Sequence, residues 1–292
     1  MEAQTYRAAL NECSPKQPLV SVVIPTHNRP YMLTQALDSV RAQTFRDYEV
    51  IVVANGEDDK MGAASRQAAI MHGAHYYSLP EGNLPAARNL GIRVAKGEWV
   101  AFLDDDDIWL PAKLERQLAE AERTSADMVV CNHVNMPPNG HDQPNNRTYP
   151  KGWAPLKALC HQKWVALPSA VLVARATLYA TGWFDEEQRV GEDSELWRRI
   201  AWRHAIHRMD EVLLRYRVGH TRMSENRHAA NQYDLRHYLK MYLDTPRDLR
   251  WALPPITTCV WRLVMRILLP RWLRQPRKWL AELARLKPTF RL

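Results

Sequence analysis

The stretch VAFLDDDDIWLP, residues 100–111, places four consecutive aspartates directly after an apolar run. Adjacent carboxylates repel one another, so such a cluster needs water or a cation around it. A hard divalent cation such as Mg²⁺ or Mn²⁺ prefers oxygen ligands, and one or two carboxylates suffice. The alternative is a solvated turn in which Asp107 lies near a helix start, where negative charge is favoured. The stretch alone leaves both interpretations open.

Outward from this stretch, short apolar runs alternate with segments of helical spacing. The runs are rich in β-branched residues and end at turn or polar residues, which favours strands. We expect strands at 19–25, 48–55, 74–80, 98–104, 126–134, 167–175 and 211–218, and helices at 31–43, 61–73, 83–97, 111–124 and from Glu192. This alternation predicts an α/β fold with a largely parallel sheet and helices on both faces.

Three polar segments follow predicted strands, namely PTHNR (25–29), ANGEDD (54–59) and DDDD (104–107). Because the carboxyl ends of parallel strands meet at one edge of a sheet, these segments should lie together. Ligands of such sheets bind at this edge. The long irregular stretch from Asn135 to about Lys163 has the character of a binding loop or lid.

A second acidic cluster, GEDSELW (191–197), puts Glu192 and Asp193 at a predicted helix start. One interpretation is favourable charge at a helix N-terminus. The other is that one carboxylate is a general base, which requires Asp193 to face the cleft that holds the cation.

Three segments together, 20–56, 83–118 and 182–200, resemble the inverting glycosyltransferases of family two. Those enzymes have the GT-A fold, which is Rossmann-like, with a mostly parallel mixed sheet and helices on both faces. The resemblance covers roughly residues 19–220, and the order and spacing of the segments make it specific. It implies a metal-dependent glycosyltransferase with Mn²⁺ or Mg²⁺ as cofactor. The donor would be a nucleotide sugar, most readily a UDP-sugar. The acceptor would be a hydroxyl of a glycan or lipid-linked molecule, as in bacterial surface polysaccharide or lipopolysaccharide synthesis.

The resemblance also implies roles for individual residues. Asp193 would be the catalytic base with Glu192 beside it, and Asp106 the direct metal ligand. The loop around 217–226 would close over the diphosphate. The implied metal ligands are Asp104, Asp106 and His220, and the implied nucleotide-binding residues are Pro25, Thr26, Arg29, Asn55, Arg88, Asp104, Asp105, Arg217 and Ser224.

The sequence departs from the family pattern after the second strand. The family loop usually reads D-D-G-S, whereas this chain has ANGE, so Ala54 and Asn55 replace both acids. Asn55 can still donate to and accept from a pyrimidine edge. Nucleotide binding is still expected, but the identity of the base stays open.

The formal net charge of +8 is concentrated in the tail. From Arg247 to Leu292 the chain has eleven Lys and Arg but two Asp and Glu, and four tryptophans. We expect a GT-A catalytic domain at 1–230, with a nucleotide-binding half at about 19–134 and an acceptor half at about 135–230. A basic, Trp-rich amphipathic helical tail would follow at 231–292. Tryptophan and arginine on amphipathic helices suit an anionic membrane surface, although packing on the catalytic domain or in a dimer is the alternative.

The N-terminus is too polar for a signal peptide, and no apolar run is long enough to span a bilayer. We therefore expect a cytoplasmic chain with peripheral contact to the inner face of the plasma membrane, and an oligomer remains open. Two other classes stay as alternatives, a nucleic-acid-binding protein that uses the basic tail and a sugar-nucleotide nucleotidyltransferase. The body of the chain is nearly neutral, so we expect no nucleic-acid partner. The loop after the first strand lacks glycine, which disfavours the nucleotidyltransferase.

Overall fold

The structure is a computed structural model that describes residues 17–138, 140–145, 152–153, 166–219, 243 and 245–253. The chain divides into two compact units, residues 1–220 and 221–292. The predicted site residues His220 and Ser224, and the tail beyond residue 253, lie outside the described residues. Among the described residues, no helix has the length and apolar character needed to cross a membrane.

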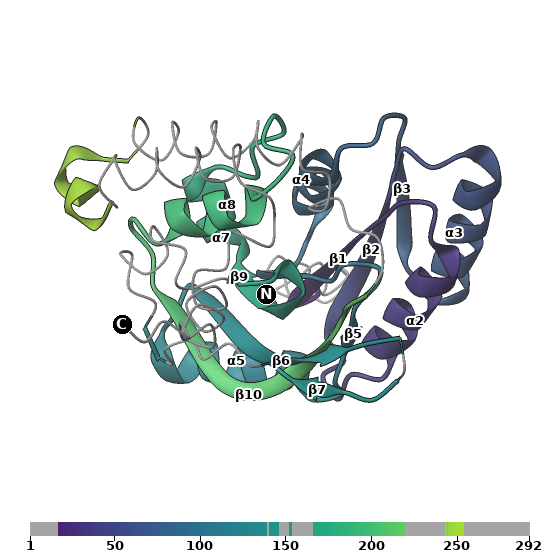
Figure 1. The fold of residues 1–292 in the computed structure, drawn as a ribbon, viewed down its shortest axis with the longest axis horizontal. Coiled ribbons are helices and arrows are strands. Elements are labelled where there is room, and N and C mark those ends of the chain that lie inside the picture. Colours follow the sequence, from purple (N-terminus) through teal and green to yellow (C-terminus); the bar gives the residue numbers. More distant parts are fainter. Residues whose placement is uncertain are drawn as a thin grey trace, which may run out of the picture. The chain divides into compact units, whose positions relative to one another are not determined.

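Unit 1 is built on one mixed sheet of ten strands (Figure 1). Its main path runs in the order β3-β2-β1-β4-β9-β6-β10-β5. The strands of this path are β1 (Val20–Thr26), β2 (Tyr48–Asn55), β3 (His75–Leu79), β4 (Trp99–Phe102), β5 (Ile108–Trp109), β6 (Met128–Met136), β9 (Val171–Ala174) and β10 (Ile206–Arg217). Two short strands, β7 (Gln143–Pro144) and β8 (Gly152–Trp153), pair with β6 and β10.

The first half of the sheet is parallel, because β1 pairs in parallel with β2 and β4, and β2 with β3. All seven residues of β1 are buried, which explains its continuous apolar sequence. The parallel register brings the carboxyl ends of β1, β2 and β4 to one edge of the sheet. The polar segments that follow these three strands therefore share that edge.

Helices cover both faces of this half. In Figure 1, α4 lies on one side of β1 and β2, whereas α2 and α3 lie on the other. The helices are α2 (Pro30–Arg41), α3 (Asp59–Met71), α4 (Leu84–Val94), α5 (Lys113–Thr124), α7 (Arg175–Thr181) and α8 (Glu192–Ile200). A 3-10 turn, η1 (Pro168–Ala170), precedes β9, and another, η3 (Arg247–Ala252), belongs to the second unit.

The second half of the sheet contains the antiparallel pairs that make it a mixed sheet, as the GT-A resemblance implies, but periodicity did not give their strand bounds or directions. The predicted strand at 167–175 is the shorter β9, which runs antiparallel to both β4 and β6. The predicted strand at 211–218 is β10, which begins earlier, at Ile206. β5 forms directly after the four aspartates and pairs antiparallel with β10. The sheet is therefore mixed: β1 to β4 pair in parallel, β6 pairs in parallel with β10, and β9 and β5 are antiparallel to their neighbours.

Candidate functional site

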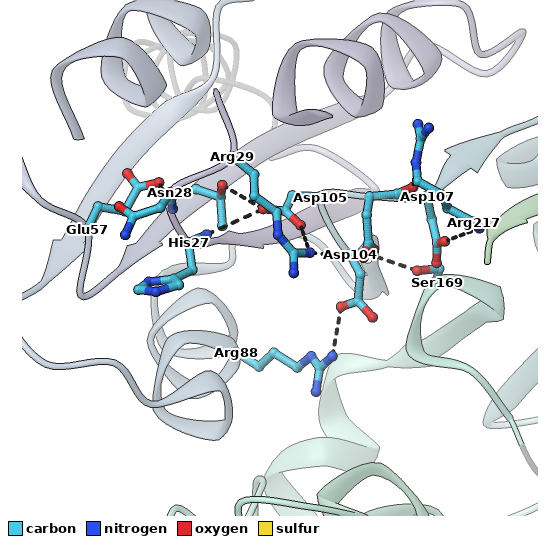
Figure 2. A network of polar contacts seen from close by, with 12 residues as sticks. His27, Asn28, Arg29, Glu57, Arg88, Asp104, Asp105, Asp107, Ser169 and Arg217 are labelled. Atoms are coloured by element: carbon cyan, nitrogen blue, oxygen red, sulfur yellow. Dashed lines mark hydrogen bonds and ion pairs between the residues drawn. The ribbon is translucent and has the colours of Figure 1, made fainter. Parts of the chain in front are cut away.

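Three loops meet at the carboxyl edge of the parallel strands (Figure 2). Thr26 Oγ1 donates to Asp105 Oδ2 at 2.8 Å, which joins the end of β1 to the acidic turn. His27 Nδ1 lies 2.7 Å from the backbone oxygen of Asn55 and must be the donor, because a carbonyl only accepts. The backbone nitrogen of Asn28 donates to Glu57 at 2.8 Å. The three polar segments thus form one hydrogen-bonded surface, as their strand-end positions predicted.

The four aspartates divide into an inward and an outward pair. A tight turn, closed by the bond from Asp107 N to Asp104 O at 3.1 Å, gives neighbouring side chains different directions. Asp105 and Asp107 are buried, while the side chains of Asp104 and Asp106 are 28% and 17% exposed. Asp104 and Asp106 are therefore the pair that an external ligand can reach.

Asp105 holds the turn against the loop after β1. Besides the Thr26 hydroxyl it accepts from the backbone nitrogen of His27, and Arg29 lies 3.4 Å away. Burial, with the charge of Asp106 adding to it, raises the pKa of Asp105 to about 7. The predicted contact of Asp105 with the nucleotide stays a prediction, and its Oδ2 already accepts from Thr26 and from the backbone of His27.

Arg29 and Arg217 approach the turn from two sides. Arg29 Nη1 lies 3.0 Å from Asp106 Oδ2, so a cation bound by Asp106 would compete with this half-exposed arginine. Arg217, at the end of β10, donates from Nε to the backbone oxygen of Asp106 and from its backbone nitrogen to Asp107 Oδ1. Burial raises the pKa of Asp107 well above its usual range. Asp107 and Arg217 thus fix the shape of the turn from inside.

Arg88 connects the acidic turn to the second acidic cluster. Its Nη2 donates to Asp104 Oδ1 and its Nη1 to Glu192 Oε1, both at 2.7 Å. Arg88 is almost completely buried. Burial opposes its charge, but Asp104 and Glu192 more than compensate and raise the pKa of the guanidinium. The sequence predicts Arg88 beside the nucleotide, and the structure has it between two carboxylates.

Glu192 and Asp193 form the first turn of α8, on the far side of Arg88 from the acidic turn. Burial raises the pKa of Glu192 to about 7, against the opposing effect of Arg88. Burial also raises the pKa of Asp193, again with Arg88 opposing. Asp193 is half-buried, and its charge acts on both Arg88 and Asp104. Asp193 therefore belongs to the same electrostatic network as the acidic turn.

Asn55 lies at the end of β2, where the predicted base contact belongs. Its carboxamide oxygen accepts from the backbone nitrogen of Asn83, which caps α4 through Ala86 N. Asn55 therefore fastens the loop before α4. Pro25 and Thr26 are buried in β1, beneath the same surface.

Three polar residues of this network were not predicted from sequence. Glu57 accepts hydrogen bonds from the backbone nitrogen of Asn28 and from the hydroxyl of Ser65. Ser169 accepts from the backbone nitrogen of Asp104, and Gln35 accepts from Arg217. Glu57 stood in a strand-end segment that the sequence marked as polar. Ser169 and Gln35 gave no comparable signal.

The outward carboxylates fit a divalent cation that is completed by a ligand. Among the described residues, no group of three or more His, Cys, Asp or Glu side chains could hold a metal by itself. Mg²⁺ and Mn²⁺ are commonly held by one or two carboxylates together with substrate phosphates and water. Asp104 and Asp106 supply that donor set, so the residues present suit a cation that arrives with a diphosphate.

Comparison with solved structures agrees with this architecture. Over 85% of this chain and 81% of theirs, it matches S. aureus TarS 1–349 in complex with UDP-GlcNAc, with a TM-score of 0.62 and 16% identity. It also matches mannosyltransferase PcManGT from Pyrobaculum calidifontis in complex with GDP-Man and Mn²⁺. That match covers 98% of this chain and 88% of the other, with a TM-score of 0.61 and 20% identity. The fold is thus the GT-A type of α/β fold.

Sequence comparison gives the family. The model for glycosyl transferase family 2 matches residues 21–186. The uncharacterized glycosyltransferase EpsJ of Bacillus subtilis is 31% identical over 250 residues, covering 74% of this chain and 68% of the relative. The chain belongs to glycosyl transferase family 2. It spans 37% of the length of a Rickettsia felis relative, an uncharacterized glycosyltransferase that is 26% identical over 75% of this chain.

Proposed function

We propose that the chain is an inverting glycosyltransferase. It would move a sugar from a nucleotide diphosphate, with UDP-sugars as the preferred donors, to a hydroxyl of a glycan or lipid-linked acceptor. The observation that carries the proposal is the bridge of Asp104, Arg88 and Glu192, which joins the acidic turn to the first turn of α8. Family membership supports the donor class, as do the UDP-GlcNAc in the TarS complex and the GDP-Man in the PcManGT complex.

The donor side of the site is the carboxyl edge of β1, β2 and β4. Asp106 and Asp104 would hold Mn²⁺ or Mg²⁺ together with the diphosphate. The cation, when bound, would neutralise negative charge on the leaving group. Arg29, which pairs with Asp106, adds a second positive charge at the same place.

The acceptor side is the first turn of α8. Asp193 would take the proton from the acceptor hydroxyl while that oxygen forms its bond to the anomeric carbon and the bond to the diphosphate oxygen breaks. A raised pKa suits this role, because the carboxylate then accepts a proton more readily near neutral pH. A single displacement from the face opposite the diphosphate inverts the anomeric configuration.

The substitution Asp193→Asn tests the assignment of the base. It keeps the size of the side chain and removes the proton acceptor, so turnover should fall by about 10²–10⁴-fold. Binding of UDP with Mn²⁺ should stay within about twofold of the unsubstituted chain, because Asp193 acts on the acceptor. Turnover is measured with a panel of UDP-sugars, and binding by titration calorimetry. Undiminished turnover would show that another group is the base.

A further inference from the structure

Arg88 holds a buried position between two carboxylates that differ in exposure. Its own side chain is 2% exposed, that of Glu192 is 10% exposed, and that of Asp104 is 28% exposed. One end of the bridge is therefore open to a ligand, and the other is closed inside the protein. Figure 2 shows Arg88 pointing from α4 toward Asp104 at the end of β4.

The surroundings of Arg88 keep its guanidinium in place. The guanidinium lies over the ring of Phe184, 5.4 Å from the ring centre. That ring packs edge-on against Phe102 and Trp197, at 5.5 and 5.9 Å between centroids. Asn89 both donates to and accepts from the backbone of Phe184, at 2.9 Å each. Within this frame the guanidinium contacts both carboxylates at once, Asp104 through Nη2 and Glu192 through Nη1.

This contact joins the first turn of α8 to α4. Gly191 precedes the helix with φ of 73° and supplies no side-chain cap. Helix starts usually rely on such a cap to satisfy their free backbone nitrogens. Here the ion pair of Glu192 with Arg88 ties the turn to α4, and Asp193 is the next residue.

We propose that Arg88 is a positioning residue that couples cation binding at Asp104 to the placement of the first turn of α8. The inference rests on the proposed function and names a property of the same site. A divalent cation at Asp104 competes with Arg88 for that carboxylate. Arg88 then bonds more strongly to Glu192, which holds Asp193 in position when the donor has bound. Arginine suits this role because its planar fork serves two acceptors with separate nitrogens.

Such coupling is reciprocal and can be measured without turnover. Glu192→Gln removes the charge that draws Arg88 away from Asp104, so Arg88 holds Asp104 more tightly. We expect the affinity for Mn²⁺ at saturating UDP to fall about fivefold, the lower end of ordinary coupling between sites. Titration calorimetry at pH 8 measures it, and GDP replaces UDP if it binds more tightly.

A double-mutant cycle separates coupling through Arg88 from a direct field effect. Arg88→Lys keeps the buried charge but cannot bridge two acids. In that background Glu192→Gln should change Mn²⁺ affinity by less than about twofold. Arg93→Lys is the matched control, because Arg93 lies on the same helix but is exposed and stacks on Trp183. In the Arg93→Lys background, Glu192→Gln should still lower the affinity for Mn²⁺ about fivefold. Thermal unfolding checks each fold, and Arg88→Gln replaces Arg88→Lys if that variant does not fold.

The outcomes are distinct. An equal effect of Glu192→Gln with and without Arg88 would overturn the coupling while leaving the transferase proposal intact. An unsubstituted chain that binds neither UDP nor GDP with Mn²⁺ would overturn the proposed function, and the coupling with it.

Discussion

Asp104 and Asp106 face outward while Asp105 and Asp107 are buried, although the four residues are adjacent in the chain. The partners that stabilise the buried pair come from distant segments, Thr26 for Asp105 and the backbone of Arg217 for Asp107. A buried carboxyl without such partners would be costly. The repulsion among the four adjacent carboxylates is thus reduced in two ways. Hydrogen bonds stabilise the buried pair, and the exposed pair is open to a cation.

At the same scale, Glu192 should give stability a pH dependence of defined sign. Burial raises its pKa from the ordinary 4.5 to about 7 in the folded chain. The folded state then binds this proton more tightly than the unfolded state does. Its contribution to the free energy of unfolding is full below about pH 4.5 and is lost as the pH rises to about 7.

In the Glu192→Gln variant this side chain cannot titrate. The variant should therefore lack the part of the decrease in the free energy of unfolding that comes from Glu192 as the pH rises. Urea unfolding at pH 5 and pH 7, in the absence of divalent cations, measures the free energy of unfolding of both chains. The free energy should fall more steeply between these pH values in the unsubstituted chain. Parallel pH dependences in the two chains would contradict the assignment.

The sequence predicted correctly that the polar segments after β1, β2 and β4 lie together. Thr26, Arg29, Asn55, Asp104 and Asp106 do meet at one edge, because parallel register aligns strand ends. Their roles toward a ligand stay predictions. The position of Arg88 as an internal bridge could not be predicted, since Glu192 lies 104 residues away and only the folded chain brings the two together.

At the scale of elements, the close packing of α4 on β1 depends on Gly91. A Cβ at Gly91 would overlap the side chain of Val23 in the buried strand β1. Gly91→Ala should therefore destabilise the fold by about 1–3 kcal/mol, as overpacking of a core usually does. Because α4 also carries Arg88, the affinity for UDP with Mn²⁺ should fall as well.

Gly62 in α3 is the matched control for this prediction. A Cβ there would have the Tyr76 hydroxyl, 3.7 Å away, as its nearest neighbour, so it fits. Gly62→Ala should be neutral or stabilise by about 0.4–1 kcal/mol, because alanine loses less entropy on folding. Urea unfolding of both variants gives the comparison. Equal stabilities of the two variants would contradict the prediction, because they would mean that β1 shifts to accommodate the added methyl group at little cost.

The sequence predicted elements best where each one repeats a single pattern. Periodicity predicted the strands β1, β2 and β4 and the helices between them. The structure has these elements with small shifts at their ends. The direction of β9 does not follow from its sequence, because an apolar run of four residues suits either direction. β5 has two residues and exists through its pairing with β10, which no local pattern can indicate.

At the scale of the whole molecule, the net charge is distributed unevenly along the chain. The excess of basic over acidic residues from Arg247 onward contrasts with the nearly neutral remainder. Uniform basicity would favour a nucleic-acid partner through many phosphate contacts. Basic residues clustered near tryptophans instead suit a lipid bilayer, which has anionic headgroups above an apolar interior.

We therefore predict that the full chain binds vesicles containing anionic phosphatidylglycerol and that the chain truncated after residue 246 does not. Each Lys or Arg near such a surface contributes about 1 kcal/mol, so removing eleven of them should weaken binding at least about tenfold. Flotation at 50 mM and 500 mM salt measures this, since salt shortens the range of the attraction. Vesicles of neutral phosphatidylcholine are the control. If the truncated chain floats as well as the full chain does, the attraction lies in residues 1–246, and the lipid-linked acceptor loses its electrostatic support.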